Sequence, residues 1–271
     1  MRLAALNVMS GGFPGYVQDL EAPARLPLLQ TAVARLQADV VGLVDTFRWD
    51  ALYKPEQLAQ LFGYKSAYCI NLGDRRLMDL GHNNGLTLLS NYEVASVETI
   101  WLGSRNALMA VIRNGQRLRR IFVLYLDDLS EDVRVQQTEA WLERLDPDEA
   151  VVALGDFNAL DPADQPLEQP AFAAFRAANP ELAQRLQSQL TDALRGEVTQ
   201  RLMGRGLRDA AGLQRQPTFP TPLFPAAISG PFLRLDQAWH SPNVVVKRFT
   251  VLYDPIFAQA SDHWPIVLDI E

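Results

Sequence analysis

The most informative feature of this sequence lies at residues 151–161, where four apolar residues are followed by a glycine and two polar side chains. A short apolar run bounded by polar residues predicts a buried strand, and Gly155 lets the backbone turn sharply there. Asp156 and Asn158 then come just past the strand, where open α/β sheets place their ligand sites. Because an Asx turn uses the same residue types, this stretch alone leaves a structural and a functional interpretation open.

Two earlier stretches repeat the pattern of an apolar strand that ends in a polar side chain. Residues 2–8 alternate as a strand does and put Asn7 on the same face as apolar residues, near the strand's end. A buried Asn needs hydrogen-bond partners, either in a neighbouring loop or in a metal or phosphate site. Residues 39–45 predict a second buried strand that ends in Asp45, and a carboxylate in this position suits Mg²⁺. A solvated strand end explains Asp45 equally well when this stretch is considered alone.

The rest of the chain contains both helical and strand patterns, including a run of predicted strands between residues 85 and 126. Residues 72–84, which include Asn84, are polar and predict a loop, and residues 206–225 are irregular and rich in proline. Residues 181–203 carry leucines at helical spacing, which we interpret as core packing. The predicted helices span residues 24–37, 55–62, 132–145, 170–178 and 181–203. The further predicted strands span residues 85–90, 94–100, 107–113, 118–126, 234–241, 244–253 and 266–270.

Composition limits the classes of function. The chain has 271 residues, 48% hydrophobic and 21% charged, which is ordinary for a globular protein with a full core. Its net charge of −7 argues against a protein that coats nucleic acid, although a local cleft with a metal ion would still permit a nuclease. The single Cys69 excludes an internal disulfide and suits a reducing, cytoplasmic location. We find neither a signal-peptide pattern nor an apolar run long enough to cross a membrane.

Two polar clusters stand near the carboxyl end of the chain. Asp236 lies in the short predicted strand at residues 234–241, and Asp262 and His263 enter the closing strand at residues 266–270. An Asp-His pair in a loop is usually without function. With a second carboxylate to orient the imidazole, however, it fits a site that neutralises a phosphoryl group.

Five of these motifs together resemble the endonuclease/exonuclease/phosphatase superfamily, in the family's order and over nearly the whole chain. The superfamily includes exonuclease III-type nucleases, deoxyribonucleases, sphingomyelinases and inositol polyphosphate phosphatases. The motifs are Asn7, the block at residues 39–45, the block at residues 85–90, Gly155-Asp156-Phe157-Asn158 and Ser261-Asp262-His263-Trp264-Pro265. The resemblance implies a single domain over residues 1–271, folded as a four-layer α/β/β/α sandwich of two packed mixed sheets with outer helices.

The resemblance also implies a phosphate-ester hydrolase in which water attacks the phosphorus in line, assisted by Mg²⁺ or Mn²⁺. It makes Asp45 the principal metal ligand, with Asn7 and Asp262 near the metal. The remaining site residues are carried over by their positions in the family's motifs. They are Asp156 to orient or deprotonate the water, Asn158 to hold water and phosphate, His263 to contact the phosphoryl oxygen, Asp236 to orient His263, Tyr125 as a further catalytic residue and Asn84 as a substrate-binding residue.

The chain departs from the family's pattern at three positions. Asp45 stands where Glu is usual, Tyr125 and Leu126 stand where many members have His-Leu, and Asn91 stands where Arg or Lys is frequent. Three functions therefore compete: a phosphoesterase for small or lipid-like esters, a nuclease of the same fold, and a binding protein that has lost the chemistry. The acidic net charge favours the first over the second. An enzyme is favoured over a binding protein because buried polar groups cost stability, yet the chain retains five of them at the predicted centre. These are Asp156, Asn158, Asp236, Asp262 and His263.

Overall fold

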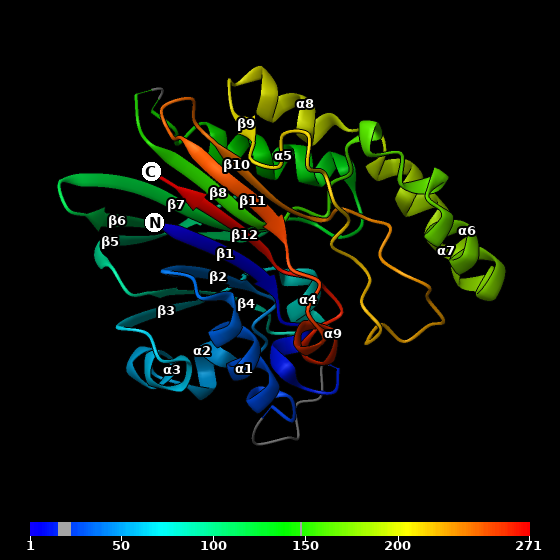
Figure 1. The fold of residues 1–271 in the computed structure, drawn as a ribbon, viewed down its shortest axis with the longest axis horizontal. Helices are drawn as coiled ribbons and strands as arrows, with labels where there is room; N and C mark the ends of the chain where they lie inside the picture. Colours follow the sequence, from blue (N-terminus) through cyan, green and yellow to red (C-terminus); the bar gives the residue numbers. More distant parts are fainter. Residues whose placement is uncertain (16–22, 147) are drawn as a thin grey trace.

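The structure, a computed structural model, describes residues 1–15, 23–146 and 148–271. Two six-stranded sheets pack face to face (Figure 1). The first sheet has the order β11 (Val246–Val251), β12 (Ile266–Ile270), β1 (Arg2–Asn7), β2 (Val40–Val44), β4 (Gly85–Ser90) and β3 (Ser66–Asn71). The second has the order β5 (Glu93–Trp101), β6 (Asn106–Asn114), β7 (Arg117–Tyr125), β8 (Val151–Asp156), β10 (Asp236–His240) and β9 (Arg208–Asp209).

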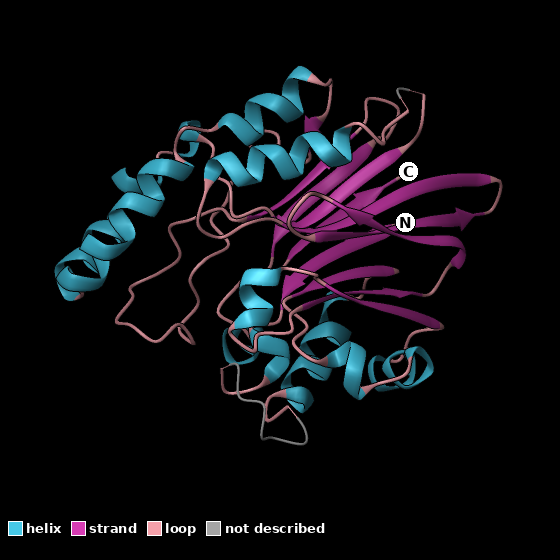
Figure 2. Ribbon diagram, turned by 180° about the vertical axis from the view of Figure 1, so that it is seen from behind, coloured by secondary structure: helices cyan, strands magenta, loops and turns pink. Residues whose placement is uncertain are grey.

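Helices cover the outer faces of both sheets, which confirms the predicted four-layer α/β/β/α sandwich (Figure 1). Below the first sheet in this view lie α1 (Leu26–Leu36), α2 (Trp49–Leu52), α3 (Pro55–Phe62) and α9 (Pro255–Ala260). Above the second sheet lie α5 (Glu131–Leu142) and α8 (Glu197–Gly204). The short α4 (Arg75–Asp79) lies at one end of the sheets, and α6 (Pro170–Ala178) and α7 (Pro180–Ala193) extend away from the sandwich (Figure 2).

Each sheet is mixed, and each has one parallel pair at its centre. β1 and β2 are parallel, with Asn7 opposite Val44, and β7 and β8 are parallel, with Tyr125 opposite Asp156. Parallel strands bring their carboxyl ends to the same edge of a sheet. β10 runs antiparallel to β8 and begins with Asp236 directly opposite Asp156. Polar residues that are far apart in the sequence therefore meet at one edge.

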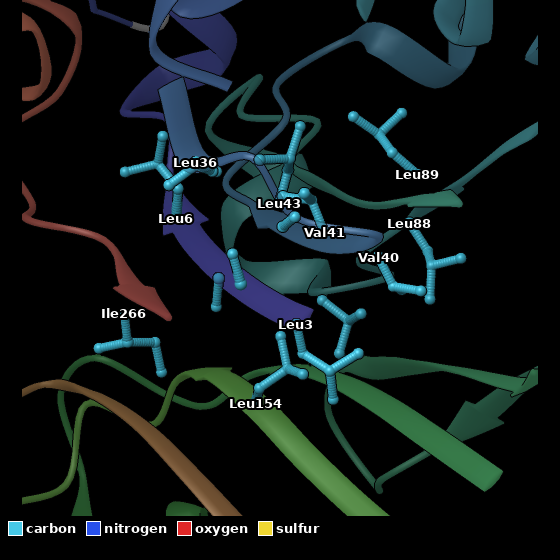
Figure 3. Packing of buried hydrophobic residues seen from close by; sticks show 14 of the residues in the cluster. Leu3, Leu6, Leu36, Val40, Val41, Leu43, Leu88, Leu89, Leu154 and Ile266 are labelled. Atoms are coloured by element: carbon cyan, nitrogen blue, oxygen red, sulfur yellow. The ribbon is translucent and has the colours of Figure 1, made fainter. Parts of the chain in front are cut away.

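The period-two alternation of the strands fills the space between the sheets with apolar side chains. Leu154 of β8 points toward Leu3 of β1 across this space (Figure 3). β2 packs closely against β7 and β8 of the second sheet, and it can do so only because residue 42 is a glycine. A Cβ atom there would lie 2.8 Å from Leu154 Cδ1 and 2.9 Å from Val123 Cγ2. Asn7 has the same strand parity as Leu3, as the sequence predicts, and therefore faces the second sheet.

The largest correction concerns the predicted helix at residues 181–203. It is two helices, because α7 ends at Ala193 and α8 begins only at Glu197. Gly196 lies between them with φ +65°, and a Cβ atom there would lie 2.5 Å from Pro162 Cδ. The leucines of the predicted single stripe consequently pack in two places, with α8 on the second sheet and α7 on α6.

The sequence patterns did not predict several short elements, among them β3, α2, α4, α9 and the two-residue β9. Residues 72–84 contain α4, whose first turn is capped by Asp74, and the strand β3 precedes them. α2 is a single turn after residues 46–48. These elements are short or mixed in polarity, so periodicity alone does not separate them from loops. In the part of the chain that the structure describes, no helix is long and apolar enough to cross a membrane.

Candidate active site

The structure brings the polar ends of β1, β8 and β10 into direct contact. Asn7 Nδ2, from the first sheet, donates a hydrogen bond of 3.1 Å to Asp156 Oδ2, in the second. The other carboxylate oxygen of Asp156 accepts the backbone N–H of Asn158 at 2.9 Å. Asp156 is 2% exposed. A buried carboxylate with both oxygens engaged has a fixed orientation.

Asn158 is held by its backbone conformation and by its side chain. Its φ of +48° lies in the left-handed region, which Asn tolerates better than most residues. Its Nδ2 donates to the carbonyl oxygen of Leu126 at 3.0 Å. The same carbonyl oxygen accepts Nη1 of Arg105. Asp156 and Asn158 therefore form a rigid turn at the end of β8, as the sequence predicts for an Asx turn, and that turn is also part of the polar cluster.

His263 and Asp236 form a buried pair beside Asp156. Asp236 Oδ2 lies 2.7 Å from His263 Nδ1, and His263 Nε2 lies 4.0 Å from Asp156 Oδ2. Ser261 fixes this loop, because its Oγ donates to the carbonyl oxygen of Asn7 at 2.6 Å and accepts the N–H of His263 at 3.1 Å. The motif at residues 261–265 therefore ties the imidazole to the end of β1.

Burial and charge act in opposite directions on this pair. Burial lowers the pKa of His263, but the carboxylates of Asp236, Asp156 and Asp262 together raise it by a larger amount. The net shift of this pKa is therefore upward. Burial raises the pKa of Asp156, and the opposing attraction of His263 does not cancel this effect. The cluster therefore favours an imidazolium held by Asp236, close to a carboxyl group that accepts a proton more readily than an exposed Asp.

The predicted metal ligands lie on the side of the site next to α1. Asp45 is 4% exposed, has φ +59°, and accepts the N–H of Ser10 on Oδ2 at 2.7 Å. Asp45 and the half-buried Asp262 both lie close to the guanidinium of Arg25. Burial lowers the pKa of Arg25, and these two carboxylates counteract that effect. Asp45 and Asp262 thus lie near the same guanidinium.

The donor atoms in this region suit a hard cation. Mg²⁺ is commonly bound by one or two carboxylates with several waters, and Asp45 and Asp262 supply two. Asn7 Oδ1 accepts the N–H of Met9 at 2.9 Å, and an amide oxygen has a second lone pair. Among the described residues, no group of three or more His, Cys, Asp or Glu side chains has the arrangement of a metal site. Two carboxylates and an amide oxygen would fit an ion that keeps several of its waters.

The two remaining predicted residues lie in or next to strands that adjoin those of this cluster. Tyr125 ends β7, in register with Asp156, and its ring centroid lies 5.0 Å from the guanidinium carbon of Arg105. Asn84 is 2% exposed and immediately precedes β4. β4 pairs with β2, so Asn84 lies one strand away from the residues that follow Val44.

Arg105 and Phe219 were not identified from the sequence. The side chain of Arg105 is fully buried, and it donates to Asp74 at 2.8 Å and to Asp128 at 2.6 Å as well as to Leu126. Phe219 places its ring centroid 4.8 Å from that of His263. Arg105 lies in a polar turn and Phe219 in an irregular segment, so no periodic pattern marks either residue.

A family model described as the endonuclease/exonuclease/phosphatase family matches residues 5–263. The chain belongs to this family. The match covers all the site residues described above, and it confirms the resemblance that the sequence motifs predicted. A search of curated protein sequences found no match.

Solved structures of this family share the fold at low sequence identity. The 3′ phosphatase NExo (D146N) from Neisseria, bound to a product DNA hairpin, is 18% identical with a TM-score of 0.68, over 100% of this chain and 99% of that one. The catalytic domain of human Nocturnin with bound sulfate is 19% identical with a TM-score of 0.63, covering 100% and 94%. A mannosyl-6-phosphatase from Bacteroides thetaiotaomicron is 15% identical with a TM-score of 0.60, covering 100% and 99%.

Proposed function

We propose that this protein is a divalent-metal-dependent hydrolase of phosphate esters, formed by a single catalytic domain over residues 1–271. The observation that carries the proposal is the contact between the two sheets. Asn7 from the first sheet binds Asp156 in the second, and Asp156 lies 4.0 Å from His263, which is itself paired with Asp236. A general base, an amide and an imidazolium at one point are the groups that hydrolysis of a phosphate ester requires.

In the proposed reaction, one water and one phosphate ester become an alcohol and a phosphate. Asp156 orients the water and accepts its proton as the oxygen bonds to phosphorus and the ester P–O bond breaks. The proton that the leaving alcohol requires comes ultimately from solvent. Asn158 holds the water or the phosphate, and the His263 imidazolium donates a hydrogen bond to a non-bridging oxygen, where negative charge increases.

We assign metal binding and substrate contact to the remaining predicted residues. Asp45, Asp262 and Asn7 would hold Mg²⁺ or Mn²⁺, which would stabilise the charge of the phosphate as a Lewis acid. Tyr125 and Asn84 would contact the substrate phosphate. A reducing, cytoplasmic location remains our expectation, and it rests on the single Cys69.

A substrate panel at fixed Mg²⁺ or Mn²⁺ tests the proposal, with a phosphodiester, a phosphomonoester, supercoiled plasmid and an abasic duplex as the four substrates. We expect hydrolysis of at least one small ester, loss of activity after treatment with EDTA, and recovery on adding the metal back. Asp156→Asn, which keeps the size of the side chain, serves as the inactive control. Turnover that persists after complete removal of metal would contradict metal dependence. No hydrolysis of any of the four would favour the binding-protein alternative.

DNA is the alternative substrate that a comparison supports, because the structure of the Neisseria 3′ phosphatase holds a DNA hairpin. The net charge of −7 points away from it, since binding to duplex DNA depends on neutralising phosphates with Lys and Arg. The plasmid and abasic-duplex arms of the panel distinguish the two.

A further inference from the structure

A cavity of about 170 Å³ adjoins the candidate active site on the side of α7. Asn158 lines it, so the cavity begins at the residue that we propose to hold the phosphate. Phe219 lines it as well, and the ring of this residue also packs against His263. The cavity thus continues directly from the reacting centre.

Most of the cavity wall is apolar and comes from two segments that lie outside the sandwich. Leu190 and Ala193 of α7 form one side, and Phe232 and Leu233 form part of the other. Figures 1 and 2 show α6 and α7 projecting from the sheets, with the loop that precedes β10 running beside them.

An aromatic cluster joins the wall at Phe232 to α6, and α6 packs on α7, which forms the other wall. Phe172 and Phe175 of α6 place their ring centroids 5.3 and 5.2 Å from that of Phe232. All three rings are at most 3% exposed. Aromatic contacts of this kind stabilise beyond the area that they bury. The cavity is therefore part of the packed structure.

The charged residues at one end of the cavity are already neutralised. The Nε atom of Arg134 donates to the buried Glu131 at 2.8 Å, and Nη1 donates to the carbonyl oxygen of Asp127 at 2.8 Å. Asp128 accepts Arg105 at 2.6 Å and Arg76 at 2.7 Å. The Nη2 atom of Arg134 has no hydrogen-bond partner among the described residues, but the guanidinium is paired with Glu131, so an apolar guest would not desolvate an unpaired charge.

We propose that this cavity receives an apolar ring carried by the alcohol part of the ester, so that the substrate is the phosphate ester of a small, benzyl-like alcohol. The inference rests on the proposed function. The size of the cavity supports this proposal, because an apolar cavity of about 150 Å³ is known to bind benzene. With the phosphate at Asn158 and His263, the ring would lie between Leu190 and Phe232, and the bond that breaks would be the one between phosphorus and the ring-bearing oxygen.

The test compares benzyl and methyl esters, each offered as the monoester and as the diester whose second group is methyl. Benzyl alcohol and methanol have similar acidity, so the comparison isolates binding of the ring from leaving-group ability. Burial of a ring predicts a kcat/KM about a hundredfold higher for benzyl than for methyl esters. Ala193→Phe, which fills the cavity, should reduce this ratio to near one. The control Ser188→Phe adds the same ring at an exposed position of α7 and should leave the ratio unchanged.

Two further measurements keep the inference testable if Ala193→Phe fails to fold or if no ester is hydrolysed. Leu190→Ala enlarges the cavity and should shift the preference toward naphthylmethyl esters. Binding of benzyl alcohol, followed by NMR, requires no turnover and should be saturable in the parent and lost in Ala193→Phe. Benzyl alcohol binding without hydrolysis of any ester would retain the cavity and overturn the proposed function. Hydrolysis with equal rates for benzyl and methyl esters, and no binding of benzyl alcohol, would overturn the cavity proposal alone.

Discussion

At the scale of single residues, Asp45 is one of the three positions where this chain departs from the pattern of its family. Asp is one methylene shorter than Glu, so on an unchanged strand its carboxylate lies about 1.5 Å further back. One of its oxygens also accepts the N–H of Ser10 at 2.7 Å, which fixes its orientation. Because Mg²⁺ requires near-ideal geometry, a retracted carboxylate should bind it weakly and should favour the more tolerant Mn²⁺.

Variants of Asp45 test this reasoning through the dependence of rate on metal concentration. Asp45→Asn removes the charge and should lower activity at least about a hundredfold. Asp45→Glu should retain or raise activity at low Mg²⁺ by bringing the carboxylate closer. Titration of Mg²⁺ and Mn²⁺ against rate checks both. A fully active Asp45→Asn variant would make Asp45 a structural strand end.

His263→Ala should lower the rate at least about a hundredfold, because it removes the proposed donor to the phosphoryl oxygen. It also leaves the buried Asp236 without its imidazole partner, so stability must be measured alongside rate. Asp236→Asn is the matched variant, because it retains the imidazole and removes the carboxylate that orients it. We expect an intermediate loss of rate for Asp236→Asn. A near-normal rate in folded His263→Ala would show that His263 does not act on the phosphate.

Cys69 is partly buried, and it provides a test of packing that does not depend on catalysis. Burial raises the pKa of its thiol to about 11, and hydrogen bonds from Thr87 and Thr46 offset this only in part. Only the thiolate reacts with alkylating agents, and at pH 8 this group remains almost entirely protonated. Modification by iodoacetamide at pH 8, followed by mass spectrometry, should be much slower in the native protein than in urea. Equal rates would contradict the partly buried environment of this thiol.

At the scale of elements, the contact between β2 and the second sheet depends on a single glycine. In Gly42→Ala the new methyl group would lie under 3.0 Å from side-chain carbons of both Leu154 and Val123. Overpacking of this kind costs about 1–3 kcal/mol in the free energy of unfolding. Urea denaturation of parent and variant measures this directly. Gly204→Ala is the control, because a Cβ atom added at Gly204 would meet nothing within 4 Å. Gly63→Ala does not serve, because Gly63 has a positive φ.

The break between α7 and α8 is also a feature of elements, and the sequence pattern predicts the two as one helix. A stripe of leucines at helical spacing runs through both, so periodicity shows no interruption. The helix ends because Gly196 adopts a left-handed conformation beside Pro162, a neighbour that is remote in the sequence. The break frees α7 to pack on α6, and this arrangement forms the wall of the apolar cavity.

At the scale of the whole molecule, the net charge of −7 predicts weak binding to nucleic acid. Affinity for a duplex of about 20 base pairs should be low at physiological salt, because few phosphates would be neutralised. Fluorescence anisotropy at several salt concentrations measures both affinity and its salt dependence. Tight binding with a steep decrease at higher salt would instead support the nuclease alternative.

The sequence by itself determined which predicted strands end in polar groups, whereas the layers of the fold were implied only by the family resemblance. Alternation along β1 placed Asn7 on a face with apolar residues, and motif order placed Asp156, Asp236 and His263 in one family pattern. Such local patterns are visible because strand and helix periods depend only on neighbours in the chain.

Only the tertiary structure decided which of these groups touch and what surrounds them. The bond between Asn7 and Asp156 joins residues 149 positions apart, and it depends on the packing of two sheets. Arg105 and Phe219 enter the site through turns and loops without a periodic pattern. The apolar cavity exists because two helices and a distant loop pack together. No local sequence signal specifies such a contact, because its energy depends on the arrangement of the whole chain.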